Sequence, residues 1–579
     1  MSTNLILRQI YLKNYLKQSV SVNCINQVRC ISNKLEPNVI KSKIPDINIP
    51  KISLDEFVWR NLDKWHDKTA LVCAETGRSY LYSDVYKKSR ALANFLYKFK
   101  GLKQGDTVAI VLPNVPEYPI VMLGAIKAGL KVTTVNPIYT SEEISRQFVD
   151  SDTKLIFTLT ELWPNINNAI KNLAPKRDIP IVTIEHQENQ TVPSGTIKFK
   201  EIVDGNNKLE FQRDTDFEDV ILLPYSSGTT GFPKGVELTM KNIVSNLHQV
   251  NAREFRIHNE TEGSHQDVVP TVLPIFHIFG MVTTALNLLS SGCKLVTVPR
   301  FGSKIFFNVL ENHRPTIAFL VPPIVLMLLN NPNIQSRHIE QIRTIVSGAA
   351  PLGAADIERI HKKSNGKITL LQGYGLTETS PTTHQQSTFI ENGVKLGGCG
   401  YNLPNTECKI ILTDDVSDKK GLGPNQSGEL LLRGPQVMKG YRNNSKATKD
   451  VLDSDGWFRT GDIAHYDEDG HFFITDRLKE LIKVKGFQVA PAELEELLRN
   501  HPDIEDAAVV GIPHRDYGEV PKAFIVPKKD VMINFSKIQE YVAAKVANYK
   551  QLAGGIVVMG NIPKSASGKI LRRQLKDIK

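Results

Sequence analysis

The segment from Tyr225 to Val236 reads Tyr-Ser-Ser-Gly-Thr-Thr-Gly-Phe-Pro-Lys-Gly-Val, and an apolar run at 220–224 leads directly into it. The apolar run predicts a short buried strand. Glycines let a backbone turn sharply and approach a ligand closely. Hydroxyls, backbone N–H groups and a lysine can then surround phosphate oxygens. A strand that feeds such a loop predicts a phosphate-binding site rather than a flexible surface loop.

The spacing of this loop differs from that of the common P-loop. That motif needs four residues between its first glycine and a Gly-Lys pair, followed by Ser or Thr. Here only two threonines separate Gly228 from Gly231, and Gly235 follows Lys234. The sequence therefore predicts a phosphate loop of another kind.

Length and composition limit the class of protein. At 579 residues the chain is too long for one core and is expected to hold at least two domains. Hydrophobic residues make up 41% and charged residues 23%, an ordinary globular composition. Apolar runs are too short to predict a membrane span. Six cysteines fit neither a zinc site nor a disulfide framework, and no Lys/Arg block predicts a nucleic-acid partner.

The net charge of +10 is unevenly distributed. Residues 1–35 carry five Lys or Arg and no acid, with leucines spaced along one helical face. This is typical of a mitochondrial transit peptide, cut near Ile31. A cytoplasmic or peroxisomal location is the alternative, although the chain ends without a Ser-Lys-Leu signal. Residues 36–50, with three prolines, are expected to form a linker.

From residue 51 onward, helix and strand patterns alternate. Residues 82–97 and 117–128 predict helices, and 106–112 and 154–158 predict strands. Such alternation favours an α/β fold with parallel or mixed sheets covered by helices. Short strands with turns follow at 395–475. The last hundred residues predict a separate small α/β unit, with a helix at 492–500 and strands at 507–511 and 522–526.

Four further segments contain residue types suited to nucleotide chemistry. Gln372-Gly373-Tyr374-Gly375-Leu376-Thr377-Glu378-Thr379 places an aromatic ring, a hydroxyl and a carboxylate after a strand. Residues 456–462 end on Asp462, which is positioned to accept ribose hydroxyls. Residues 476–487 connect the large part of the chain to the small unit. Residues 563–570 contain Lys569. Each segment alone is weak evidence for a nucleotide site, because such residues are usually found in ordinary loops.

The order of all five segments resembles the adenylate-forming superfamily of acyl- and aryl-CoA synthetases, luciferases and adenylation domains. The resemblance runs from about Leu54 to Lys569. Leu273-Pro274-Ile275-Phe276-His277, Ser347-Gly348-Ala349-Ala350-Pro351-Leu352 and Leu478-Lys479-Glu480-Leu481-Ile482-Lys483 are most similar to 4-coumarate:CoA ligases and luciferase-like ligases.

The resemblance implies an architecture. It comprises a large N-terminal domain (51–476) of stacked mixed or parallel sheets with helices and a small β-barrel-like part. A hinge (477–483) connects it to a small mobile C-terminal α+β domain (484–579). Lys479 would be the hinge residue itself.

The resemblance also implies residue roles. The ATP site would comprise Ser226, Ser227, Gly228, Thr229, Thr230, Gly231, Lys234, Ala349, Ala350, Gln372, Gly373, Tyr374, Thr377, Asp462 and Arg477. Glu378 and Thr230 would bind Mg²⁺. His277, Phe279, Gly348, Gly397 and Gly398 would border the acyl pocket. Lys569 would serve adenylation, Lys483 and Gln488 would serve thioester formation, and Lys485 and Gly486 would line the coenzyme A channel, with His277 acting near the carboxylate.

This reading predicts an enzyme that uses ATP, Mg²⁺ and coenzyme A to convert a fatty or 4-coumarate-like acid to its thioester. Adenylation joins two anions, so positive charge must neutralise the charge that develops. A luciferase-like oxygenase is one alternative, and a non-catalytic nucleotide-binding scaffold is another. Fold analogy does not fix the acid or the oligomeric state.

Overall fold

The computed structural model describes residues 38–578 except for gaps at 174–176, 188, 214–215, 227–232, 350–351, 414–419, 479, 485–486, 516 and 566–567. The predicted transit peptide lies outside the described residues. So do the site residues Ser227, Gly228, Thr229, Thr230, Gly231, Ala350, Lys479, Lys485 and Gly486, and the side chain of Gln488.

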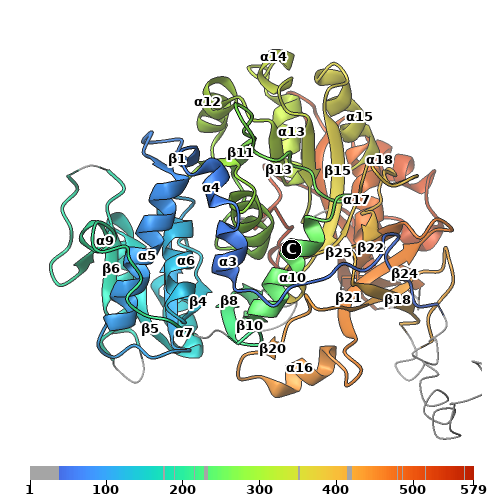
Figure 1. The fold of residues 1–579 in the computed structure, drawn as a ribbon. Helices are drawn as coiled ribbons and strands as arrows, with labels where there is room; N and C mark the ends of the chain where they lie inside the picture. Colours follow the sequence, from blue (N-terminus) through green and yellow to red (C-terminus); the bar gives the residue numbers. More distant parts are fainter. Residues whose placement is uncertain are drawn as a thin grey trace, which may run out of the picture.

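The largest sheet has nine strands, eight of them in the order β20-β10-β8-β4-β3-β5-β6-β7, with β9 paired to β10 (Figure 1). These strands are β3 (Thr107–Val111), β4 (Lys131–Thr134), β5 (Thr153–Leu159), β6 (Ile181–Ile184), β7 (Ile197–Lys198), β8 (Val220–Leu223), β9 (Tyr225–Ser226), β10 (Lys234–Thr239) and β20 (Gly440–Tyr441). Strands β3, β4, β5, β6 and β8 run parallel, and β10 is antiparallel to β8.

Helices cover both faces of this sheet. Strand β3 is buried along its whole length. Val108 and Ile110 pack in the same cluster as residues of α5 (Tyr82–Lys98) and α6 (Glu117–Lys127). Ala109 and Val111 pack on the other face with residues of α7 (Ser141–Ser151) and α8 (Trp163–Lys171). The alternation of strand side chains thus produces a near-continuous apolar run. The predicted helix at 82–97 and strand at 106–112 are confirmed.

A second sheet supplies most of one wall of the cavity described below. It comprises β13 (Ile317–Leu320), β14 (Thr344–Ser347), β15 (Thr369–Gly375), β16 (Thr382–Gln385) and β17 (Tyr401–Asn402). The first three strands are parallel, so their carboxyl ends lie at one edge. Ligands in α/β folds bind at such edges.

Two four-stranded sheets complete the large body. One is ordered β11-β12-β1-β2 and comprises β11 (Val268–Thr271), β12 (Lys294–Thr297), β1 (Thr69–Cys73) and β2 (Ser79–Leu81). The other is antiparallel and comprises β18 (Glu407–Ile411), β19 (Gly428–Arg433), β21 (Phe458–Tyr466) and β22 (Phe472–Arg477). The latter occupies the region where the sequence predicted short strands with turns.

The C-terminal unit, coloured at the red end of the bar in Figure 1, has hydrophobic clusters of its own. Its sheet comprises β23 (Ile482–Val484), β24 (Phe487–Val489), β25 (Ile504–His514), β26 (Gly518–Pro527) and β27 (Ile556–Val558). Its helices are α17 (Pro491–Arg499), α18 (Phe535–Ala543) and α19 (Arg572–Lys576). The predicted helix at 492–500 and both predicted strands are confirmed.

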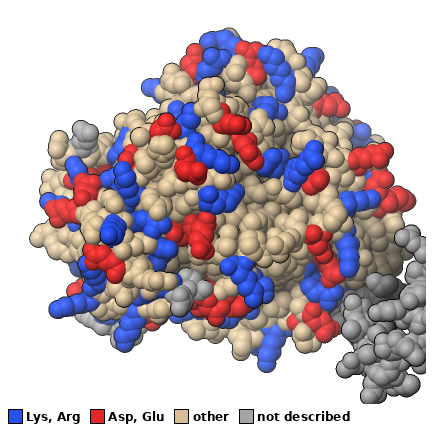
Figure 2. Space-filling model, viewed as in Figure 1, with Lys and Arg blue, Asp and Glu red and all other residues tan. Residues whose placement is uncertain are grey.

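The surface shown in Figure 2 carries Lys and Arg interspersed with Asp and Glu. On that face, the described residues form no broad patch of one sign. Among the same residues, no helix is both long and apolar enough to cross a lipid bilayer.

Candidate active site

A cavity of about 1040 Å³ lies between the large body and the C-terminal unit. Its walls come from the ends of β4, β14, β15 and β16, from the stem of the phosphate loop, and from α19 and the turn before it. The cavity brings together most of the described site residues that the sequence predicted. Those lining it are Ser226, Lys234, His277, Phe279, Gly348, Ala349, Gly373, Tyr374, Thr377, Glu378, Arg477 and Lys569.

The stem of the phosphate loop is a β-hairpin. Strands β9 and β10 pair with Ser226 opposite Lys234 and Tyr225 opposite Gly235. A Cβ on Gly235 would lie 3.1 Å from the ring of Tyr225, so the glycine lets this ring pack across the stem. The Tyr225 hydroxyl donates to Asp150 Oδ2 at 2.5 Å, which ties the stem to α7. The stem of the phosphate loop is therefore fixed against α7 at this point.

Glu378 lies beside this stem in a short 3₁₀ helix (Thr377–Thr379). Its Oε1 accepts hydrogen bonds from Ser226 Oγ at 2.8 Å and from Tyr441 Oη at 2.9 Å. None of the described residues donates to Oε2. The described part of the chain holds no cluster of three His, Cys, Asp or Glu that could bind a metal. One carboxylate beside a polyphosphate is nevertheless a usual Mg²⁺ site, with phosphate and water completing the shell. The residues present fit that ion.

Tyr374, Asp462 and Arg477 form one polar unit. Tyr374 Oη donates to Asp462 Oδ2 at 2.6 Å, and Arg477 Nε lies 3.2 Å from Asp462 Oδ1. Asp462 on β21 is the direct partner of Arg477 on β22, so sheet register sets the ion pair. Burial raises the pKa of Asp462, and the positive charge of Arg477 opposes that shift. Tyr374 and Arg477 line the cavity, and Asp462 lies directly behind them.

Lys569 of the C-terminal unit lines the cavity near the Tyr374–Asp462–Arg477 unit. Burial lowers the pKa of the Lys569 ammonium, and the nearby charge of Arg477 lowers it further, while Glu480 and Asp462 oppose the shift. The preceding Gly568 has φ +80, and a Cβ there would lie 3.3 Å from Val321 Cβ of the large body. The turn that carries Lys569 thus packs directly on the start of α13 (Pro322–Asn330).

The thioester residues predicted from the sequence lie elsewhere. Lys483 on β23 is exposed and is not part of the cavity lining. Its backbone pairs with Gln488 on β24, so the two residues share one hairpin. The structure therefore brings Lys569, but not Lys483, to the cavity, beside Asp462 and Arg477.

The other end of the cavity is bordered by a π-helix, η3 (Phe279–Leu286). Phe279 faces Gly348 at the end of β14, where a Cβ would lie 3.0 Å from the Phe279 ring. Burial lowers the pKa of His277 to about 4, so its imidazole is neutral near pH 7. A π-helix has a wider turn than an α-helix and is frequent at functional sites. Here it brings Phe279 and Thr283 to the same lining.

Two predicted pocket residues are placed differently. Gly397 and Gly398 do not line the cavity. A Cβ on Gly398 would clash with the ring of His471, and one on Gly397 would meet open space. Both lie instead in a loop that packs on the β21–β22 hairpin, and the structure does not bring either glycine to this cavity. The missing side chain at Gly398 permits that packing.

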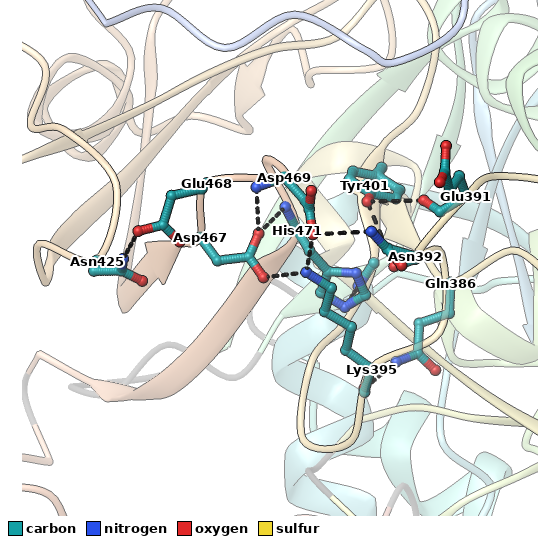
Figure 3. A network of polar contacts seen from close by, with 11 residues as sticks. Gln386, Glu391, Asn392, Lys395, Tyr401, Asn425, Asp467, Glu468, Asp469 and His471 are labelled. Carbon is teal, nitrogen blue, oxygen red and sulfur yellow. Dashed lines mark hydrogen bonds and ion pairs between the residues drawn. The ribbon is translucent and has the colours of Figure 1, made fainter.

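Figure 3 shows how this loop is held. Lys395 Nζ contacts Asp467 Oδ2 at 2.6 Å and Asp469 Oδ2 at 2.5 Å. Gln386 Nε2 donates to the carbonyls of Lys395 and Gly398.

Gln372, assigned to the ATP site from the sequence, also lies outside the lining. The backbone N–H of Gln372 donates to Gln386 Oε1, and the side-chain Oε1 of Gln372 accepts from Leu352 N. Gln372 thus supports the segment after β14 from the side away from the cavity.

Sequence reasoning missed several lining residues. Tyr441 bonds Glu378 across 63 positions, and its ring lies 4.9 Å from Lys234 Nζ. Thr283 and Thr382 face each other across the acyl end, with their hydroxyl oxygens 3.3 Å apart. Ser347, the first residue of the segment 347–352 quoted above, lines the same cavity, although no role had been assigned to it. Tyr441, Thr283 and Thr382 come from distant segments, and no local pattern marks them.

Comparisons with known proteins agree with this geometry. The AMP-binding enzyme family model matches residues 58–442, and that of the AMP-binding enzyme C-terminal domain matches residues 493–569. 4-Coumarate--CoA ligase 1 of Arabidopsis thaliana is 39% identical over 94% of this chain and 96% of its own length. Probable 4-coumarate--CoA ligase 2 of Dictyostelium discoideum is 37% identical over 93% and 97%, respectively.

A solved structure extends the match. ATP-bound MatB from Rhodopseudomonas palustris aligns with a TM-score of 0.79 and 26% identity, over 91% of this chain and 99% of that one. The matches cover both the large body and the C-terminal unit. The chain belongs to the AMP-binding enzymes of the adenylate-forming superfamily, as an AMP-forming acid–thiol ligase that uses ATP, Mg²⁺ and coenzyme A.

Proposed function

We propose that the acid is a cinnamate-like aryl acid such as 4-coumarate rather than a fatty acid. The observation that carries this proposal is the polar lining of the acyl end. The Thr283–Thr382 hydroxyl pair lines this end of the cavity. A hydrocarbon chain packed there would offer these hydroxyls no hydrogen bond, whereas a ring hydroxyl of an aryl acid can form one.

The Phe279–Gly348 contact supports the same choice. The missing side chain at Gly348 lets the Phe279 ring pack against the end of β14, so an aromatic ring borders the acyl end. Aromatic rings favour stacked or edge-to-face contacts with one another. The relatives at 37–39% identity carry the name 4-coumarate--CoA ligase, which favours an aryl acid for this chain as well.

In this proposal, a carboxylate oxygen of the acid attacks the α-phosphorus of ATP. The new bond joins acyl oxygen to phosphorus, the α–β anhydride bond breaks, and pyrophosphate leaves. Lys569 and Lys234 supply positive charge where negative charge accumulates. Bound Mg²⁺ would neutralise phosphate charge, with Glu378 as the described residue that holds it. Neutral His277 borders the carboxylate without adding a competing charge.

The thiol of coenzyme A then attacks the acyl carbon, and AMP leaves with the anhydride oxygen. We place this step in a second arrangement of the C-terminal unit, in which the hairpin of Lys483 and Gln488 replaces Lys569 at the cavity. The exposure of Lys483 in the present arrangement supports this assignment. Domain rotation of this kind is a common way to serve two half-reactions from one site.

The test compares kcat/KM for thioester formation with 4-coumarate, caffeate, benzoate, hexanoate and octanoate. Emitted light is recorded in parallel, to detect luciferase-like oxygenation. We expect the hydroxycinnamates to exceed both fatty acids by at least about tenfold, which corresponds to about 1.4 kcal/mol. A preference for hexanoate or octanoate would overturn the aryl-acid proposal while leaving the ligase chemistry intact.

A further inference from the structure

Tyr441 lies between the stem of the phosphate loop and Glu378, a position that the phosphate-loop motif does not indicate. It lies on β20, which pairs with β10 directly after the loop, with Tyr441 opposite Val236. Arg442 N donates to Gly235 O at 2.8 Å, and Tyr441 N donates to Thr448 Oγ1 at 2.9 Å. The backbone of Tyr441 is therefore fixed against the stem of the phosphate loop.

The side chain of Tyr441 contacts two groups of opposite charge. Its hydroxyl donates to Glu378 Oε1, the same oxygen that accepts from Ser226. Its ring faces Lys234 Nζ at 4.9 Å from the centroid, within the range of a cation–π contact.

Two donors on a single oxygen restrict how a carboxylate can rotate. With Oε1 held by Ser226 and Tyr441, the oxygen left for a ligand is Oε2. Outer partners of this kind orient metal-binding carboxylates and commonly affect metal affinity 10–100-fold. The same phenol ring lies against the Lys234 ammonium.

We infer that Tyr441 is a positioning residue for the metal–polyphosphate complex. Its hydroxyl orients Glu378 so that Oε2 faces the divalent cation, and its ring holds Lys234 beside the same phosphates. A purely structural Tyr441 would instead only close the edge of the nine-stranded sheet. The two roles differ in whether removal of the hydroxyl alone changes cation binding.

The test uses the full-length protein and Mn²⁺ as a spectroscopic substitute for Mg²⁺. Mn²⁺ binding is titrated by electron paramagnetic resonance in the presence of ATP and without any acid. For Tyr441→Phe we expect about 10–100-fold weaker Mn²⁺ binding. The affinity for ATP without metal should stay within about twofold, because the ring over Lys234 remains. Tyr466→Phe is the matched control, since the Tyr466 hydroxyl donates to Leu422 O away from the cavity.

Tyr441→Leu removes both hydroxyl and ring. We expect the same loss of Mn²⁺ binding and, in addition, about two- to fivefold weaker metal-free ATP binding, the range of an exposed cation–π contact. Ser226→Ala removes the other donor to Oε1 and should also weaken Mn²⁺ binding, which keeps the test valid if a Tyr441 variant does not fold. Unchanged Mn²⁺ binding in folded Tyr441→Phe would overturn the inference. So would a loss in Tyr441→Phe matched by an equal loss in Tyr466→Phe. Because no acid is present, neither result depends on the proposed aryl substrate.

Discussion

The two ends of the cavity are constructed differently. At the nucleotide end, hydrogen bonds and ion pairs fix several charged groups, as in the Tyr374–Asp462–Arg477 unit. At the acyl end, close packing, as between Phe279 and Gly348, accompanies a few hydroxyls and no ion pair among the described residues. ATP is the same in every turnover, so its site can be rigid and polar. Selection among acids depends on the space and the few hydroxyls at the other end. Substitutions at the nucleotide end should therefore lower activity equally for every acid, whereas substitutions at the acyl end should change the preference among acids.

The largest expected effect is at the nucleotide end. Lys569→Ala should reduce adenylation about 10²–10³-fold, because loss of one group that stabilises developing charge costs about that much. The factor should be the same for every acid. Conversion of supplied acyl-adenylate and coenzyme A to thioester should be retained. Single-turnover pyrophosphate release and thioester formation measure the two steps separately.

Lys550→Ala is a suitable control, because Lys550 pairs with Glu493 within the same unit and outside the cavity lining. Equal loss of both half-reactions in Lys569→Ala would contradict the assigned role. An acid-dependent loss would contradict the separation between the two ends.

A second prediction concerns the junction behind the nucleotide end. Helix α17 begins after Ala490, whose methyl group cannot accept a hydrogen bond from the first turn. Asp476 Oδ2 of the large body accepts from Ala492 N at 3.0 Å and takes the place of a cap. Burial raises the pKa of Asp476 to about 6, although Arg572 opposes the shift; Glu495 adds to it. The folded state therefore favours the protonated acid.

A raised pKa gives stability that is fully present below the unfolded pKa of 3.8 and is lost as pH rises through about 6. The Asp476 contribution should therefore make the wild type about 1.4 kcal/mol more stable at pH 5 than at pH 7.5, because pH 5 lies about one unit below the folded pKa. Asp476→Asn keeps a capping oxygen and removes the charge, so its advantage over wild type should be largest at pH 7.5 and shrink toward pH 5. Urea midpoints at both pH values measure it. A difference independent of pH would rule out titration of Asp476.

Regular elements were predictable because their signals are local. The apolar run of β3 and the helical pattern of α5 each follow from neighbouring residues. The polar residues of the nucleotide end were also largely predictable, since Tyr374 and Glu378 belong to one contiguous motif and Lys234 to another.

The other residues of the site could not be predicted, because their positions depend on tertiary contacts. Tyr441 acts through a hydrogen bond to a residue 63 positions away. Ser347 and Thr283 come to the same cavity lining only because a strand end meets a π-helix. The position of Gly397 and Gly398 outside the cavity lining could not be predicted, because a glycine-rich segment can indicate either ligand space or close packing. Only the position of His471 distinguishes the two at Gly398.

The smallest expected effect tests the comparison most directly. Gly348→Ala places a Cβ 3.0 Å from the Phe279 ring and narrows the acyl end alone. Gly560→Ala is the control, because a Cβ there meets nothing within 4 Å. The measurement is kcat/KM for 4-coumarate and for hexanoate, together with KM for ATP. We predict about a tenfold loss for 4-coumarate, a smaller loss for hexanoate, and a KM for ATP within about twofold of wild type, as one methyl group changes selectivity by about 1–3 kcal/mol. An equal loss for both acids with a raised KM for ATP would contradict the account.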